Sequence, residues 1–499
     1  MMKSILFLLL VLLLVSCIPT NQVTSERITP TTTAVSPTTT PLPTATLIPT
    51  SLPTAEAPTP TEPAIPTPTE PTVPTPTPVP SAPNQSNGRS NSPAISDDGQ
   101  VIAFTSTGNL TGNAVWQRDT VFVRDLTAQT TELINITLDG QAGKWDVYGL
   151  ALSGNGRVVA YYSHDGNLVP DDEVACGIET EPVSCEDLFI YDRDTAVTER
   201  IPLGRGQGLG GDYTLSLSDD SRLVAYSFHI YDRTTGLTAD LPTTDGERPN
   251  GYTFAPQFAG DGRFLAFISG ASNLVPNDTN EQFDIFVWDR ETNQVERTSI
   301  SADGTEGNET SGAMPFHEGI GSALTISGDG RFVAYGSLAT NLADGVVNEC
   351  ADYRGFTRAC YNIYLYDRQT GTTQLVTQNS DGDSVTPSLS GDGRFLAFTS
   401  LATTLTDETL PNCQFPAIVN CGQIYLYDRE TGRISLISRA LTGQGSDQGN
   451  WQPDFAGNGR YLTFVSAADS LVPGDTNESS DIFRFDLQTG QLERVSLMN

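Results

Sequence analysis

A ten-residue pattern recurs seven times along this chain and limits the folds that the chain can adopt. One clear copy runs from Ile326 to Tyr335 with the sequence ISGDGRFVAY. The copies lie 41 to 68 residues apart and are centred on Ser96, Ser153, Ser218, Ala259, Ser327, Ser390 and Ala456. Repeats of this length indicate one array of similar units rather than several unrelated domains.

Each repeat contains four runs with the character of β-strands. Around Ser390 they cover residues 387–390, 394–399, 424–427 and 433–437, with apolar alternation and many β-branched or aromatic residues. In six copies Asp-Gly or Asn-Gly joins the first two runs, which predicts a tight type I′ hairpin turn. The third copy has Asp220-Ser221 instead, and its middle runs are so close that we expect a very tight hairpin or a lost strand.

Four antiparallel strands repeated seven times predict an all-β fold, a seven-bladed β-propeller of four-stranded blades. Neighbouring blades around a ring can cover the apolar sheet faces that one unit alone cannot bury. The array begins with an inner strand and ends with an outer one. We therefore expect blade one to pack against blade seven without strand exchange.

The motif Ser-x-Asp-Gly-Arg-x-x-Ala-Phe, seen at residues 390–398, resembles the WD40-like repeats of the TolB propeller family, called PD40 repeats. The resemblance extends over nearly all of residues 92–499. It implies a propeller fold and does not indicate a particular activity. TolB itself has a separate N-terminal domain, and this chain has a Pro/Thr-rich segment in that position.

The first 17 residues have the features of a bacterial lipoprotein signal peptide. Lys3 precedes an apolar run from Ile5 to Val15, which is short for a membrane span. The run ends in Leu-Val-Ser-Cys, which resembles a lipobox and makes Cys17 the expected lipidation site. These features predict a lipid-anchored protein of the bacterial cell envelope that faces the extracytoplasmic side and contacts the membrane only through its anchor.

Residues 18–91 hold 18 of the 32 prolines and many threonines. Their apolar content is too low to bury a core, and proline favours extended polyproline II conformations. We therefore expect a disordered, semi-rigid linker that carries a propeller at residues 92–499.

The chain is strongly acidic, with 60 Asp and Glu against 27 Lys and Arg and a formal net charge of -33. Such a surface repels phosphate backbones, which argues against nucleic-acid binding. We expect a monomer whose acidic residues maintain solubility.

Six cysteines besides Cys17 fall in pairs inside the variable gaps of three repeats. None shows the spacing of a zinc site, and an exported protein meets an oxidising compartment. Local pairing predicts three disulfides, Cys176 with Cys185, Cys350 with Cys360, and Cys413 with Cys421.

Strand alternation places the variable gaps and the links between blades on one face, here called the long-loop face, and the short turns on the other. Binding residues concentrate on loops held by a rigid scaffold, so the long-loop face is the candidate binding surface. Aromatic residues near the inner strands could stack on a sugar or enclose a cation, or could simply pack between blades. The candidate ligand-binding residues are Trp145, Tyr148, Tyr213, His317 and Trp451.

Two gaps contain Asp-Thr-Asn followed by a further aspartate. Oxygen ligands at alternating loop positions are what calcium prefers, whereas turn capping is the alternative explanation. The candidate metal ligands are Asp278, Asn280, Asp284, Asp475, Asn477 and Asp481, and calcium is the only cofactor that the sequence suggests.

The sequence has no nucleophile elbow, no His-Glu-x-x-His and no Walker loop, so we assign no catalytic residue. We expect a protein that binds a partner protein or a cell-surface glycan of the envelope through its long-loop face. One alternative is an exported propeller enzyme, a glycan hydrolase or lyase assisted by calcium, which requires carboxylates that converge at the channel mouth. Another alternative is an architectural envelope component related to TolB.

Overall fold

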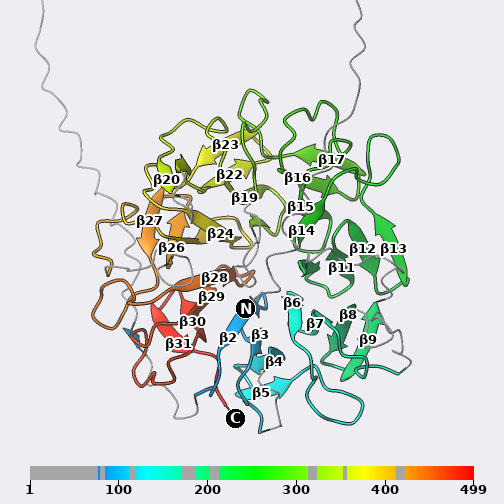
Figure 1. The fold of residues 1–499 in the computed structure, drawn as a ribbon, viewed down its shortest axis with the longest axis vertical. Helices are drawn as coiled ribbons and strands as arrows, with labels where there is room; N and C mark the ends of the chain where they lie inside the picture. The colour runs from blue at the N-terminus through cyan, green and yellow to red at the C-terminus, as the bar shows by residue number, and fades with distance from the viewer. Residues whose placement is uncertain are drawn as a thin grey trace, which may run out of the picture. The chain divides into compact units, whose positions relative to one another are not determined.

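The computed structural model describes residues 77–78, 85–112, 118–170, 186–201, 213–312, 323–351, 357–411 and 422–498. Within these ranges seven sheets surround a central axis (Figure 1), which confirms the predicted seven-bladed propeller. The signal peptide, Cys17 and nearly all of the linker lie outside the described residues. No helix in the described ranges is long and apolar enough to cross a membrane.

Each blade is a four-stranded antiparallel sheet whose strands follow chain order from the axis outward (Figure 1). The first three blades consist of β2 (Ser90–Ile95), β3 (Val101–Ser106), β4 (Thr120–Asp125) and β5 (Thr130–Leu133); β6 (Val147–Leu152), β7 (Val158–Ser163), β8 (Asp187–Asp192) and β9 (Val197–Ile201); and β10 (Leu215–Leu217), β11 (Leu223–Tyr226), β12 (His229–Asp232) and β13 (Leu237–Asp240).

The remaining blades have the same order of strands. They consist of β14 (Thr253–Phe258), β15 (Phe264–Ser269), β16 (Asp284–Asp289) and β17 (Gln294–Arg297); β18 (Leu324–Ile326), β19 (Phe332–Ser337), β22 (Asn362–Asp367) and β23 (Thr372–Leu375); β24 (Ser384–Leu389), β25 (Phe395–Ser400), β26 (Gln423–Asp428) and β27 (Arg433–Leu436); and β28 (Asn450–Phe455), β29 (Tyr461–Ser466), β30 (Asp481–Asp486) and β31 (Gln491–Arg494). A small extra hairpin, β20 (Glu349–Ala351) and β21 (Thr357–Ala359), lies in the gap between β19 and β22.

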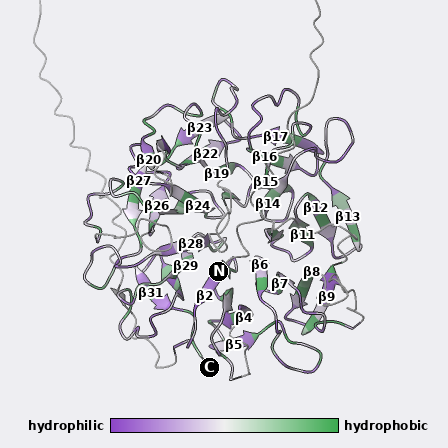
Figure 2. Ribbon diagram, viewed as in Figure 1, coloured by the Kyte–Doolittle hydropathy of each residue, from purple (hydrophilic) through white to green (hydrophobic). Residues whose placement is uncertain are grey.

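The apolar core is divided among the seams between blades. Seven clusters of buried side chains occur, and each contains residues from two neighbouring blades. The cluster that closes the ring joins Ile95 and Phe104 of blade one to Trp451 and Ile482 of blade seven. Figure 2 shows hydrophilic residues over many loops around the outside of the ring. Each blade thus covers the apolar face of its neighbour, as the repeat predicted.

The turn between the first two strands differs from the predicted type I′ geometry. Within residues 96–101 only Gly99 has a positive φ, of 72°, whereas type I′ requires two such residues. Ser96 replaces part of the backbone pairing, because its Oγ accepts a hydrogen bond from Val101 N (3.0 Å) and donates one to Asp98 Oδ1 (2.7 Å). The prediction of type I′ was therefore wrong, although the position of the hairpin was right.

Blade three keeps all four strands by means of the very tight hairpin that we expected. Tyr226 pairs directly with His229, so only Ser227 and Phe228 form the turn between β11 and β12. Ser227 takes a positive φ of 49° there.

Blades one and seven each take their four antiparallel strands from consecutive parts of the chain, but the sheet of blade seven also receives a fifth strand from the N-terminal segment, so the expectation of closure without a strand from that segment was wrong. This strand, β1 (Thr77–Pro78), pairs in parallel with β31 on the outer edge of blade seven. Side chains also cross the closing seam. Ser92 N donates to Gln452 Oε1 (2.9 Å), and Ile95 N donates to Asp454 Oδ2 (3.0 Å).

Candidate functional site on the long-loop face

Two of the predicted ligand-binding residues lie in direct contact at the seam between blades two and three. The rings of Tyr148 and Tyr213 stack with centroids 4.6 Å apart, and His164 meets Tyr148 edge-on at 5.9 Å. Gly149 permits this approach, because a side chain there would place its first carbon 1.9 Å from the carbonyl oxygen of Tyr213. The bulge at Gly149, which has a φ of 56°, thus brings the two inner strands together.

A carboxylate that the sequence analysis did not single out belongs to the same cluster. Glu186 immediately precedes β8, and burial raises its pKa, while a hydrogen bond with Tyr213 and the charge of His164 oppose the shift. Its Oε1 atom is buried and has no hydrogen-bond partner among the described residues. The cluster therefore combines stacked aromatic rings with a partly buried carboxylate that has an unused acceptor oxygen among the described residues.

Trp145 lies on the loop that leads to this cluster and is 45% exposed. The carboxylate of Asp165, the neighbour of His164 in sequence, accepts hydrogen bonds from the backbone N–H groups of Lys144 (2.9 Å) and Trp145 (3.4 Å). Asp165 is itself buried, and burial raises its pKa while these two hydrogen bonds oppose the rise. The backbone around Trp145 is thus fixed and its indole is open to solvent.

The structure does not bring Trp451 into this cluster. Trp451 is only 8% exposed and packs in the cluster between blades seven and one, which agrees with the packing alternative. His317 lies outside the described residues.

One predicted disulfide is present on this face. Cys350 and Cys360 are bonded across the hairpin of β20 and β21, in the gap of blade five. The other two pairs, Cys176 with Cys185 and Cys413 with Cys421, fall outside the described ranges.

The six candidate calcium ligands surround arginine side chains. In blade four, Arg297 Nη1 lies 3.2 Å from Asp278 Oδ1 and 3.3 Å from Asp284 Oδ2. Asn280 Nδ2 donates to Asp284 Oδ2 (2.9 Å). Burial raises the pKa of Asp278 to about 6, although Arg297 opposes the rise.

Blade seven repeats this arrangement with Arg494, Asp475 and Asp481, and Asn477 Nδ2 donates to Asp481 Oδ2 (3.0 Å). Within the described part of the chain, no group of three or more His, Cys, Asp or Glu side chains is placed to hold a metal ion. These contacts agree with a structural role for both loops, which is the alternative to calcium binding, and calcium binding stays a prediction.

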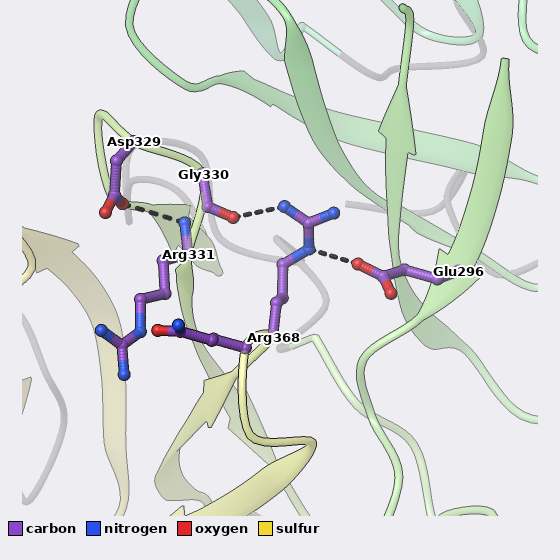
Figure 3. A pocket seen from close by; sticks show the side chains of 6 residues that line it. Glu296, Asp329, Gly330, Arg331 and Arg368 are labelled. Carbon is purple, nitrogen blue, oxygen red and sulfur yellow. Dashed lines mark hydrogen bonds and ion pairs between the residues drawn. The ribbon is translucent and has the colours of Figure 1, made fainter. Parts of the chain in front are cut away.

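The opposite face, which carries the short turns, has a polar recess of about 310 Å³ between blades four and five (Figure 3). Arg368 spans this seam: it donates to Glu296 of blade four and to the carbonyl oxygen of Gly330. Arg331 forms two hydrogen bonds with Asp367 (2.9 and 2.7 Å). Since both guanidinium groups already have carboxylate partners, we interpret this recess as part of the blade junction.

Three carboxyls near the inner strands have raised pKa values. Burial raises the pKa of Asp219 to about 6, with contributions from Asp97 and two other acids. Burial also raises the pKa of Asp454 to about 7, again with a contribution from Asp97. These three carboxyls are the ones that bear on the enzyme alternative.

These observations define the class of protein as a seven-bladed β-propeller with an aromatic and acidic cluster on its long-loop face. No family model matches the chain, and no curated protein matches it either. The seven-bladed propeller is shown, and the assignment of its repeats to the PD40 type stays a prediction.

Many solved propeller structures resemble this one. They include the β-propeller domain of the trilobed protease from Pyrococcus furiosus, with 12% identity, a TM-score of 0.44, and coverage of 84% of this chain and 98% of that chain. An oligogalacturonate lyase from Vibrio parahaemolyticus has 13% identity and a TM-score of 0.46 over 81% of this chain and 92% of that chain. TolB from Acinetobacter baumannii has 16% identity and a TM-score of 0.35 over 76% and 78%. Identities and scores this low support no statement about function.

Proposed function

We propose that this protein is a lipid-anchored, extracytoplasmic propeller that binds a glycan or a protein of the bacterial cell envelope through its long-loop face. The observation that carries the proposal is the stacked pair Tyr148 and Tyr213, with Glu186 and His164 beside it. The chemistry favours a glycan, because aromatic rings bind sugar faces and a carboxylate accepts hydrogen bonds from sugar hydroxyls. A protein ligand that presents a Lys or Arg side chain is the second outcome of the same test.

The overall charge supports a neutral or cationic ligand. A net charge of -33 disfavours phosphate-rich ligands such as nucleic acids. It does not oppose neutral polysaccharides or cationic groups, and the buried oxygen of Glu186 lacks a donor in the described part of the chain.

Binding can be tested with the exposed residue Trp145. The full chain and its Trp145→Ala variant are applied to a glycan array and used to capture envelope proteins. Leu237→Ala is the matched control, because Leu237 is 69% exposed on blade three and lies outside the cluster. We expect Trp145→Ala to weaken retention and Leu237→Ala to leave it unchanged; equal retention by all three proteins contradicts the proposed site.

The lipid anchor is tested separately. Replacement of Cys17 by Ser is expected to abolish incorporation of labelled fatty acid and to release the protein from membranes. Continued membrane association of Cys17→Ser would contradict anchoring through this residue, without bearing on the binding site.

A second candidate function is glycan cleavage by the carboxyls Asp97, Asp219 and Asp454. Raised pKa values are typical of groups that exchange protons during catalysis, and a carboxyl with a pKa of about 7 can act as a general acid near neutral pH. Release of oligosaccharides by the full chain, lost in Asp219→Asn, supports this candidate. Retention of the glycan without cleavage supports binding alone.

A further inference from the structure

The Asp-Thr-Asn loop of blade four holds the link that leads to blade five. Thr279 donates through its backbone N to Glu306 Oε1 (2.9 Å) and through its hydroxyl to Glu306 Oε2 (2.6 Å). Asn280 Nδ2 donates to the carbonyl oxygen of Gly307 (3.2 Å). The loop therefore binds two consecutive residues of the incoming link.

The equivalent loop of blade seven makes corresponding side-chain contacts with the N-terminal segment. Thr476 Oγ1 donates to Gln85 Oε1 (3.1 Å), and Asn477 Nδ2 donates to the carbonyl oxygen of Ser86 (3.2 Å). Gln85 Nε2 also donates to the carbonyl oxygen of Gly474 (2.5 Å). Gln85 and Ser86 thus occupy the places of Glu306 and Gly307.

The correspondence continues five residues later, at Ser311 and Ser90. Ser311 N donates to Phe283 O (2.8 Å), and Ser311 Oγ lies 3.0 Å from Ser337 Oγ. In blade one, Ser90 N donates to Ser480 O (2.7 Å), and Ser90 Oγ lies 3.1 Å from Ser106 Oγ. Residues 85–90 therefore follow the path of residues 306–311.

We propose that the Asp-Thr-Asn loops are clasps for the links between blades, and that the clasp of blade seven binds this chain's own residues 85–90 to close the ring. The propeller then begins functionally at Gln85, within the segment that the sequence assigned to the linker. The parallel pairing of Thr77 and Pro78 with β31 extends the same attachment along the outer edge of blade seven.

The clasp of blade seven is weaker than the clasp of blade four, because the side chains that they bind differ in charge. In blade four, Arg297 Nη1 contacts the carboxylate of Glu306 at 2.7 Å in addition to the two aspartates. In blade seven the bound side chain is the neutral amide of Gln85, so the clasp lacks the attraction that a carboxylate would have for Arg494. The seam between blades seven and one is consequently expected to open before the seam between blades four and five.

Hydrogen exchange of the full chain, followed by mass spectrometry, tests this proposal. Gln85→Ala removes the side chain that the clasp of blade seven binds, and Thr476→Val removes the hydroxyl that binds it. Gln488→Ala is the control, because Gln488 is exposed on the turn after β30, away from the clasp. Thr476→Val removes one hydrogen bond and is expected to speed exchange in residues 85–95 and 474–484 by roughly three- to tenfold. Gln85→Ala removes that bond and those to Gly474 and Asp475, so its exchange is expected to be at least as fast, and the control is expected to match the wild type.

The double variant Gln85→Ala with Thr476→Val distinguishes a shared contact from two separate effects. If the two residues act through one contact, the double variant exchanges no faster than the faster single variant. Two results would overturn the proposed clasp. One is an unchanged exchange rate in Gln85→Ala, and the other is a double variant whose rate increase equals the product of the two single increases. Exchange that is faster at the seam between blades four and five than at the closing seam of the wild type would overturn the proposed order of opening.

Discussion

Arg494 Nη1 lies 2.8 Å from Asp475 Oδ1, and both side chains are almost completely buried. The same nitrogen lies 3.4 Å from Asp481 Oδ2. A charge that is removed from water needs a partner, so these three groups depend on one another.

Replacement of Arg494 by Ala leaves two buried carboxylates without their cation. We expect the free energy of unfolding to fall by about 3–5 kcal/mol in denaturant titrations. Arg222→Ala is the comparison, because Arg222 pairs with Asp232 at 2.6 Å while half exposed, and such pairs contribute under about 1 kcal/mol. Equal losses for the two variants would show that burial does not govern this pair.

The same guanidinium groups bear on the calcium hypothesis. Because Arg297 and Arg494 already form ion pairs with these carboxylates, we expect a chelator such as EGTA to leave the melting temperature unchanged. A reproducible fall on chelation, restored by added calcium, would show that the ion is bound despite the arginines.

The closing seam is expected to respond to pH through Asp454. Its pKa is raised from 3.8 to about 7, so the folded state holds this proton more tightly than the unfolded chain. The stabilising contribution of the protonated carboxyl is complete below about pH 4, declines as the pH rises, and is lost above about pH 7. Asp454→Asn retains a side-chain acceptor for Ile95 N without this titration.

We therefore expect Asp454→Asn to gain melting temperature relative to the wild type as the buffer changes from about pH 5 to about pH 8. Ser388→Ala is the control, because Ser388 accepts the equivalent bond from Phe455 N (3.0 Å) and does not titrate in this range. If the difference in melting temperature between Asp454→Asn and the wild type stays constant with pH, the raised pKa of Asp454 is contradicted.

Two tryptophans named from the sequence are expected to behave in opposite ways. Trp451 is buried in the closing seam, so Trp451→Ala leaves a cavity and should cost about 3–5 kcal/mol of unfolding free energy. Trp145 is 45% exposed, so Trp145→Ala should change stability by less than about 0.5 kcal/mol. Thermal and chemical unfolding of both variants tests this contrast, and a stable Trp451→Ala protein would contradict the role in packing.

The repeat predicted the parts of the fold that depend on local pattern. Strand positions, the tight hairpin at Ser227 and Phe228, and the local pairing of Cys350 with Cys360 all follow from residues that lie close in the sequence. The turn type was missed because Ser96 competes for hydrogen bonds that the Asp-Gly rule assigns to the backbone.

The composition of the site depended on contacts across seams and was less predictable. Tyr148 and Tyr213 could be named because both stand five residues before a repeat centre, but Glu186 shows no such pattern and meets them only when two blades pack. Arg494 was also missed, although its partners Asp475 and Asp481 lie in the same repeat, and Gln85 was missed because its partner Thr476 lies 391 residues away in the sequence. The signal that could have prompted a search for Arg494 was an arginine at the end of the fourth strand in both repeats that contain Asp-Thr-Asn, Arg297 and Arg494.

Each apolar cluster of this ring belongs to a single seam between two blades, and this separation affects how such chains can evolve. A change that disturbs one cluster leaves the other six with their own packing intact. Substitutions can therefore accumulate in the loops of one blade, including those beside Tyr148, without disturbing the packing of the other seams.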